Sequence, residues 1–166
     1  MPLATRRHVA PALVLLSCGQ RHQIEALHNE AGGPLARVLG LELAPPLSGD
    51  PLAMQTPAAG LLHPLPLDPG LALADGSHWA EILGAWRQPS LVLLHADQNG
   101  SGTAAAVTAL LQQWQVPLLG LVQWGQSWDA HQRRADGLPW LGWLDAGGGA
   151  AELAVLARLR ANQLET

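Results

Sequence analysis

The chain contains no lysine, and arginine supplies all nine of its basic side chains. The commonest phosphate-binding loop on an α/β scaffold uses a lysine to reach the β and γ phosphates of a nucleotide. The absence of lysine therefore argues against the standard chemistry of an NTPase. The arginines are scattered singly or in pairs through a chain of net charge −4. They form no basic stripe that would neutralise a nucleic-acid backbone, so we expect no nucleic-acid partner.

Phenylalanine and tyrosine are also absent, and Cys18 is the only cysteine. A single cysteine excludes an internal disulfide and a zinc site built from thiolates. The histidines show no spacing typical of metal ligands, so we expect no metal site and no cofactor. This cysteine usage is typical of a cytoplasmic protein.

The N-terminal region combines two arginines with an apolar stretch from Val9 to Cys18, as a secretion signal does. The stretch is short, Pro11 interrupts its start, and no small-x-small cleavage site follows. We interpret it as a first β-strand, with lipoprotein processing before Cys18 as the alternative. No stretch reaches the roughly 18 uninterrupted apolar residues that a membrane span needs, so we expect no membrane partner.

The clearest structural pattern lies between Leu91 and Val122. An apolar run, Leu91–His95, leads into polar residues and the glycine-containing turn Gly100–Thr103. A helical stretch from Ala104 to Trp114 follows, and a second apolar run starts at Pro117. This order predicts a parallel strand–helix–strand unit whose turn lies where such folds bind ligands.

The same alternation over the rest of the chain predicts a single α/β domain for residues 1–166. We expect an open, mostly parallel sheet of four or five strands with helices on both faces, a three-layer fold of the P-loop NTPase or Rossmann type. The expected parallel strands are Val9–Ser17, Leu91–His95, Leu118–Val122 and Trp140–Leu144. The expected helices are Gln20–Glu30, stopped by Gly32 and Gly33, Ser77–Trp86, capped by Asp75, and Ala150–Asn162; Ala36–Leu43 fits a strand or a short helix.

The segment from Ala44 to Leu73 differs in composition from the rest of the chain, because it holds seven of the thirteen prolines. Proline lacks the backbone N–H that a central strand or a helix interior needs. We therefore predict a long Pro-rich loop over about residues 44–73. Its regularly spaced leucines indicate that it packs on the body of the domain.

Several segments together resemble dethiobiotin synthetase, a member of the P-loop ATPase superfamily close to the MinD and cobyric-acid amidase groups. The resemblance begins at Trp86-x-x-Pro89 and runs through the buried strand, the Gly100–Thr103 turn and its helix to Val116-Pro117-Leu-Leu-Gly120-Leu-Val. The later Gly137-Leu-Pro139-Trp-Leu-Gly142 is similar to another strand of that family. The resemblance covers about Ser77 to Leu144 and implies the P-loop fold and a place in biotin-related metabolism.

The family's phosphate-binding loop, G-x-x-x-x-G-K-[ST], belongs after the first strand, where this chain has Leu16-Ser-Cys-Gly-Gln-Arg21. That segment has one glycine, no lysine and no hydroxyl to hold Mg²⁺. We therefore expect a non-catalytic or atypical relative, with a degenerate loop, that binds a small anionic metabolite or a protein partner. We also count a homodimer among its expected assemblies.

The candidate ligand site is the turn at Gly100, Ser101, Gly102 and Thr103. Backbone N–H groups at the start of a helix attract anions, helped by the helix dipole. Asp97 ends the preceding strand, and Trp124 and Trp128 flank a polar loop that could form an apolar wall. The alternatives are a plain turn capped by Ser101 or Thr103, with Asp97 in a solvated loop or Asx turn and the tryptophans as core or interface anchors.

A second function class uses Cys18 as a nucleophile in an unrelated α/β enzyme. His22 follows Cys18 by one helical turn, and a thiol beside an imidazole can be activated. The same enzyme could instead use the Gly100–Thr103 turn. A lone cysteine at the end of a strand can also be an inert small apolar residue.

Overall fold

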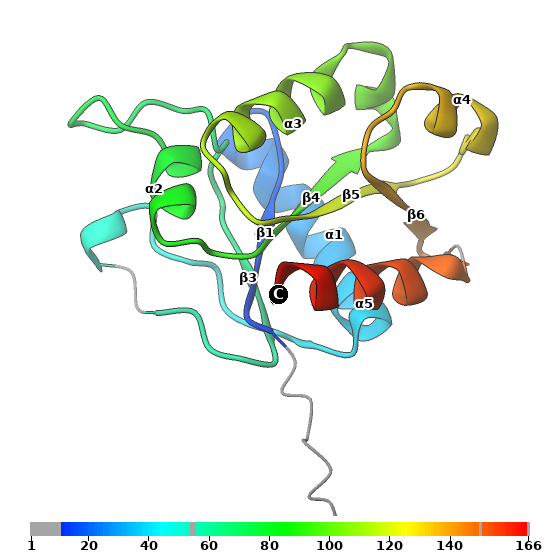
Figure 1. Ribbon diagram of the computed structural model, residues 1–166, viewed down its shortest axis with the longest axis horizontal. Coiled ribbons are helices and arrows are strands. Elements are labelled where there is room, and N and C mark those ends of the chain that lie inside the picture. Colours follow the sequence, from blue (N-terminus) through cyan, green and yellow to red (C-terminus); the bar gives the residue numbers. More distant parts are fainter. Residues whose placement is uncertain (1–10, 54–55, 150, 166) are drawn as a thin grey trace, which may run out of the picture.

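The computed structural model describes residues 11–53, 56–149 and 151–165 and shows an α/β fold around one seven-stranded sheet (Figure 1). The strand order is β2-β3-β1-β4-β5-β6-β7, and every neighbouring pair is parallel except β6 and β7. The strands are β1 (Leu13–Leu16), β2 (Glu42–Leu43), β3 (Leu61–Pro64), β4 (Ser90–His95), β5 (Leu118–Trp124), β6 (Trp140–Asp145) and β7 (Gly148–Gly149). The helices are α1 (Arg21–Leu39), α2 (Trp79–Ala85), α3 (Thr103–Gln113), α4 (Ala130–Ala135) and α5 (Glu152–Leu164), with 3-10 turns η1 (Pro51–Ala53) and η2 (Ala96–Gly100).

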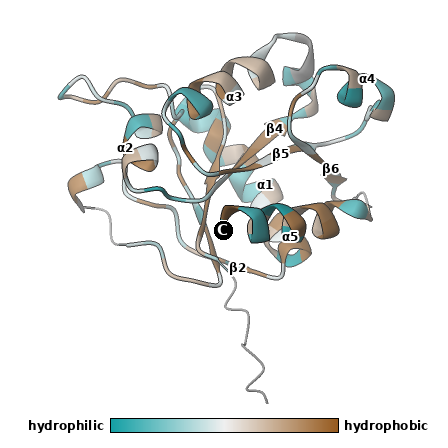
Figure 2. Ribbon diagram, viewed as in Figure 1, coloured by the Kyte–Doolittle hydropathy of each residue, from teal (hydrophilic) through white to brown (hydrophobic). Residues whose placement is uncertain are grey.

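Helices cover both faces of the sheet, which confirms the predicted three-layer fold. Leu13 and Leu15 of β1 point into a core shared with α1 and α5. Val14 and Leu16 point into a second core shared with α2 and α3. Figure 1 shows α3 above the central strands and α5 below them. Because both faces are covered, the central strands are mainly apolar, as the brown β4 and β5 in Figure 2 show.

The predicted strand–helix–strand unit is present as β4, α3 and β5. These two strands pair in parallel, with Leu93 beside Val122. The expected parallel strands at the N-terminus and near residue 140 are β1 and β6, which flank this pair in the same sheet. The N-terminal strand is shorter than predicted, and Val9 and Ala10 lie outside the described residues.

The first helix was predicted to stop at Gly32 and Gly33. It instead continues to Leu39. Gly32 packs closely against the next strand, since a Cβ on it would lie 3.3 Å from the Leu43 side chain. Burial of Leu35 in the core favours the continued helix and outweighs the local cost of the glycines and of Pro34. Gly40, with φ of 70°, ends the helix. The ambiguous segment Ala36–Leu43 is thus the end of α1 followed by β2.

The Pro-rich segment is not only a loop, because it contains the inner strand β3 between β2 and β1. Pro64 is tolerated there for a geometric reason. Its carbonyl accepts from the N–H of Leu47, so Pro64 turns its backbone polar side toward β2. Since β2 has already ended at Leu43, the missing N–H of Pro64 breaks no ladder bond. On its other side, β3 keeps its hydrogen bonds to β1, and the N–H of Leu65 donates to the carbonyl of Leu15 (3.0 Å).

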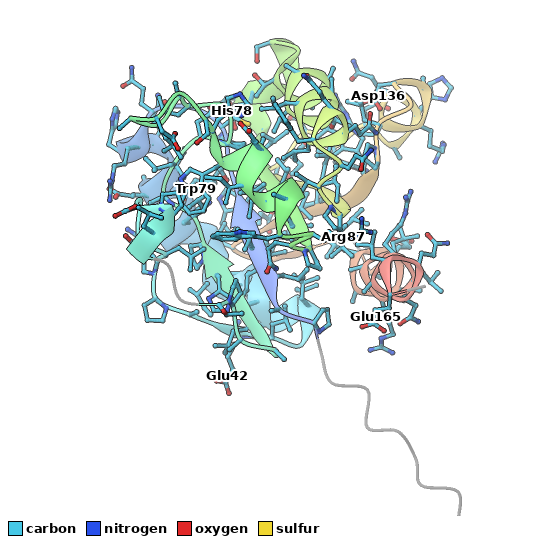
Figure 3. All side chains as sticks on the ribbon, turned by 60° about the vertical axis from the view of Figure 1, so that its left-hand side comes forward. Glu42, His78, Trp79, Arg87, Asp136 and Glu165 are labelled. Atoms are coloured by element: carbon cyan, nitrogen blue, oxygen red, sulfur yellow. The ribbon has the colours of Figure 1, made fainter. Side chains whose placement is uncertain are left out.

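Helix α2 begins two residues later than predicted, and Asp75 does not cap it. The Asp75 carboxylate instead accepts from the N–H (3.0 Å) and the hydroxyl (2.6 Å) of Ser77 in a tight turn before the helix. Trp79 opens α2 and is completely buried (Figure 3). Gly84 lies against α3 so closely that a Cβ there would overlap the carbonyl oxygen of Trp114.

The segment after β5 holds more regular structure than predicted. The polar connection Ser127–Ala135 contains α4, which Asp129 caps by accepting from the N–H groups of His131 and Gln132. The glycine-rich residues 147–149 contain β7. The C-terminal helix is α5; Ala150, its predicted first residue, lies outside the described residues. No helix in the described ranges is both long and apolar enough to cross a bilayer.

Candidate functional site

The sheet topology places a crevice between the carboxyl ends of β1 and β4. The two strands are neighbours, but the chain after β1 enters α1 on one face, whereas the chain after β4 enters α3 on the other. The loops therefore diverge, and ligands of open α/β sheets bind at such a switch point. The candidate turn Ser101–Thr103 lies on the α3 side of this crevice, and Cys18 lies on the β1 side.

The backbone N–H groups after β1, which could bind an anion, already donate to protein side chains. The N–H of Gly19 donates to Oδ2 of Asp68 (2.8 Å), and the N–H of Gln20 donates to Oε1 of Gln23 (3.1 Å). The other oxygen of Asp68 accepts from the N–H of Gly70 (2.9 Å) and holds the carboxylate in place. The position where a phosphate would meet the start of α1 is thus occupied by a protein carboxylate. Its negative charge repels a phosphate.

Arg21, the cation nearest to that loop, does not replace the missing lysine. Its Nε lies 2.8 Å from Oε1 of Glu25, in an exposed ion pair along the surface of α1. The pairing directs the guanidinium toward a neighbouring helical turn. The loop after β1 therefore combines a bound carboxylate with a cation that is already paired.

Gln98 joins the two loops that form the crevice. Its side-chain oxygen accepts from the N–H of His95 (3.0 Å), and its Nε2 donates to the carbonyl of Cys18 (3.1 Å). The side chain of Asp97, by contrast, is 91% exposed. The N–H of Asp97 donates to Nδ1 of His95 (3.2 Å), so Asp97 forms part of a solvated turn beside the crevice.

The turn predicted to be the site has a defined geometry. The Ser101 hydroxyl donates to the carbonyl of Gln98 (2.8 Å), and its oxygen lies 2.7 Å from the Thr103 hydroxyl. Gly102 adopts a left-handed conformation (φ 70°) at the N-cap position of α3. Neither Ser101 nor Thr103 caps the helix with its side chain, which corrects that part of the plain-turn interpretation. Gly100 ends η2 directly before this turn.

Two hollows lie on either side of Cys18 at this edge of the sheet. The hollow on the α3 side measures about 280 Å³, and its wall includes the apolar side chains of Val107 and Leu110. Asp68, Ser101 and Thr103 supply its polar groups. The hollow on the α1 side measures about 310 Å³ and is lined by Cys18, Gln23, Ala26, Leu27, Glu30, His95, Asp97 and Gln98.

The two tryptophans expected to form an apolar wall do not line these hollows. Trp124 is buried in the core on the α1 and α5 side. Trp128 packs edge-on against Trp140, with ring centres 5.5 Å apart. The guanidinium of Arg133 lies over the ring of Trp140. Residues that the sequence did not single out line the α3-side hollow instead: Val107 and Leu110 form its apolar wall, and Asp68 supplies a carboxylate. Asp68 follows a proline and a leucine in the Pro-rich segment, and no local periodicity indicates its position.

Cys18 is poorly suited to act as a nucleophile in the folded protein. Burial, reinforced by the negative charge of Asp68, raises the pKa of its thiol to about 12. Only the thiolate is a strong nucleophile, and these surroundings disfavour it at neutral pH. The side chain of His22 is exposed, and no hydrogen bond links it to Cys18 among the described residues.

A buried Ser17–His28 pair adjoins the crevice but has a structural role. The Ser17 hydroxyl donates to the carbonyl of Leu93 (2.7 Å), and Nε2 of His28 lies 3.0 Å from the hydroxyl oxygen. Since the single hydroxyl proton is used, Nε2 carries a proton and donates to Ser17. Burial lowers the pKa of His28 to about 4, so the imidazole is neutral at physiological pH. The pair ties α1 to β4 across β1.

Within the described part of the chain, no three histidine, cysteine or acidic side chains come together as metal ligands would. The crevice therefore offers amide N–H groups, hydroxyls, carboxylates and an apolar wall.

No known protein family, curated protein or solved structure matches this chain.

Proposed function

We propose that this protein is a dethiobiotin synthetase-like binding protein that holds a small anionic metabolite without hydrolysing ATP. The observation that carries the proposal is the crevice at the switch point between β1 and β4, with the Ser101–Thr103 turn on its rim. Crevices in this position are the usual ligand sites of open parallel sheets. The resemblance of the Ser77–Leu144 region to dethiobiotin synthetase supports biotin-related metabolism as its setting, with a protein partner in the same metabolism as the other kind of ligand.

The start of α3 suits the anionic group of the ligand. A helix N-terminus carries a partial positive charge, and α3 begins without a side-chain cap to compete for its N–H groups. The hydroxyls of Ser101 and Thr103 lie beside those groups. No atom would lie within 4 Å of a Cβ on Gly102, so the space above the turn is open.

Asp68 supports a ligand that also carries a basic group. Its carboxylate lines the same 280 Å³ hollow as the α3 turn, and Val107 and Leu110 supply an apolar wall between them. A carboxylate at α3, a short aliphatic chain and an amine near Asp68 would complement this arrangement. Diamino acids such as 7,8-diaminopelargonate belong to that class, and the family resemblance makes this compound the first to test.

A thermal-shift screen of the full-length protein with nucleotides, 7,8-diaminopelargonate and common carboxylate metabolites tests the proposal. A ligand at 100 times its Kd raises stability by about 2.7 kcal/mol, which is readily measured. We expect a carboxylate metabolite, rather than ATP, to raise the melting temperature.

Two variants on α3 locate the binding site. Ala106 lines the hollow, and Ala106→Trp would fill it; Ala105→Trp adds the same bulk to an exposed neighbour outside the lining. Binding that is lost in Ala106→Trp and kept in Ala105→Trp supports the crevice. A ligand that still binds to Ala106→Trp lies elsewhere and contradicts the proposed site.

The alternative, an unrelated α/β enzyme that uses Cys18, is tested by Cys18→Ser. Cys18 lines both hollows, and this position is the observation in its favour. If the protein is the binding protein proposed here, neither the parent protein nor a folded Cys18→Ser variant should convert any screened metabolite. Activity that disappears in a folded Cys18→Ser variant would favour the enzyme.

A further inference from the structure

A further hollow of the described structure lies at the amino ends of the strands, opposite the crevice. It measures about 510 Å³ and lies between the C-terminal end of α1 and the inner side of α5. Leu13 at the start of β1 and Leu119 near the start of β5 form part of its floor. Its residues take no part in the function proposed above.

This groove exists because of the way α5 is oriented. Small residues of the helix, Ala154, Ala157 and Ala161, line the groove. Larger apolar residues of the same helix, such as Val155 and Leu159, are 60% and 55% exposed. An amphipathic helix ordinarily buries its largest apolar residues. The alanines leave open a space that leucines would have filled.

The chemistry of the lining is apolar inside and cationic at the rim. The floor is formed by leucines and alanines, and the exposed guanidinium groups come from Arg37 on α1 and Arg158 on α5. Among the described residues, neither guanidinium has a hydrogen-bond or ion-pair partner. The C-terminal part of the groove ends at Glu165, at the end of α5 (Figure 3). The lining thus carries two unpaired positive charges and one carboxylate around an apolar space.

We propose that this groove binds a free aliphatic carboxylate, a small molecule with an anionic head and a hydrocarbon chain. The volume lies within the range of about 300–1,000 Å³ that is typical of small-molecule sites. Arginine pairs with a carboxylate through two parallel hydrogen bonds, so Arg37 and Arg158 would hold the head group. The chain would lie along Ala157 and Ala161, where it is removed from water.

Decanoate, decanol and decylamine are suitable probes because they share one chain and differ in the head group. Isothermal titration of the full-length protein with each compound should give binding in the order decanoate, decanol, decylamine. Arg158→Gln should weaken decanoate binding by about tenfold, as expected for the loss of one hydrogen bond to a charged group. Arg160 lies two residues further along the same helix and outside the lining. Arg160→Gln is therefore the matched control and should bind decanoate as the parent protein does.

A second pair of variants tests the apolar part of the groove. Ala161→Leu places a large side chain in the hollow and should abolish decanoate binding. Ala109→Leu makes the same change at an exposed position of α3 and should leave binding unchanged. Circular dichroism of each variant confirms that it is folded.

Three results would overturn the proposal: no decanoate binding by the parent protein, equal binding of decanoate and decylamine, or full binding by a folded Ala161→Leu. Loss of decanoate binding in Ala106→Trp would equally contradict it, because that residue lines only the crevice near β1 and β4. The two sites are therefore tested independently.

Discussion

The Ser17 hydroxyl, the Cys18 thiol and the His28 imidazole lie close together around the end of β1, and all three are removed from water to a large degree. Burial disfavours the charged form of an ionisable group, which raises the pKa of a thiol and lowers that of an imidazole. The shifts make Cys18 and His28 neutral at physiological pH. Cys18, the candidate nucleophile of the sequence, is thereby held in an unreactive form.

His28 should make the protein less stable in acid. Its pKa is lowered from 6.5 to about 4 in the folded state, so between these values the unfolded chain binds a proton that the folded protein does not. The stability present above pH 6.5 is therefore lost as the pH falls toward 4, by up to about 3 kcal/mol. Urea unfolding measured at several pH values should show this loss. His28→Leu should remove this part of the slope, whereas His131→Leu, at an exposed position, should retain it.

Cys18 should react slowly with thiol reagents while the protein is folded. A rise in pKa from 9.0 to about 12 lowers the thiolate fraction at pH 8 by about a thousandfold. Alkylation by iodoacetamide at pH 8, followed by mass spectrometry, should be much slower in buffer than in 8 M urea (roughly the concentration that unfolds most domains). Equal rates in the two conditions would show that the thiol is exposed and ionisable, and would revive the enzyme alternative.

At the scale of elements, the close contact of α2 with α3 depends on one glycine. Gly84→Ala would place a methyl group on the carbonyl oxygen of Trp114, which is backbone and cannot rotate away. Overpacking of this kind costs about 1–3 kcal/mol or more, and we expect the upper part of that range. Chemical denaturation measures the loss in the free energy of unfolding.

Gly33 provides the matched substitution in α1. No atom lies within 4 Å of the position of its Cβ, and the residue is helical. Gly33→Ala should therefore leave the free energy of unfolding close to that of the parent protein, because the helix preference of alanine over glycine is offset by the contact of its Cβ with the ring of Pro34, the next residue in the helix. Equal effects of Gly84→Ala and Gly33→Ala would contradict the contact between α2 and α3.

At the scale of the whole molecule, the protein should not hydrolyse ATP at a meaningful rate. Phosphoryl transfer depends on positive charges that clamp the phosphates, and the loop after β1 instead presents Asp68 to the N–H of Gly19. A phosphate-release assay with Mg²⁺ and ATP should give no more than the buffer control. Robust Mg²⁺-dependent hydrolysis that disappears in Arg21→Ala would show that arginine replaces the lysine.

A homodimer is a further expectation for the whole molecule. Symmetric dimers are the commonest assemblies of soluble proteins. Sedimentation velocity of the full-length chain should then show a species of twice 17.5 kDa. A single species at the mass of one chain across the concentration range would contradict this prediction.

The sequence by itself determined the central architecture. The apolar runs that became β1, β4, β5 and β6 can be recognised because a strand that packs on both faces is apolar at nearly every position. The turn before α3 is equally local, since its polar residues and glycines separate a strand from a helix. The absence of lysine is likewise evident from the composition alone, and the argument against ATP hydrolysis rests on it.

Only the tertiary structure decided the features that depend on distant neighbours. Pro64 fits in an inner strand because β2 ends before it reaches the level of Pro64. Helix α1 continues past Gly33 because burial of Leu35 in the core stabilises the longer helix. Trp124 lies in the core and not in the crevice, and Asp68, 49 residues from Gly19 along the chain, accepts a hydrogen bond from the N–H of Gly19. Local propensities differ by about 1 kcal/mol per residue, and burial or a buried hydrogen bond contributes as much or more. Contacts between distant segments therefore overrule local preference at these positions, and they decided which side chains form the crevice.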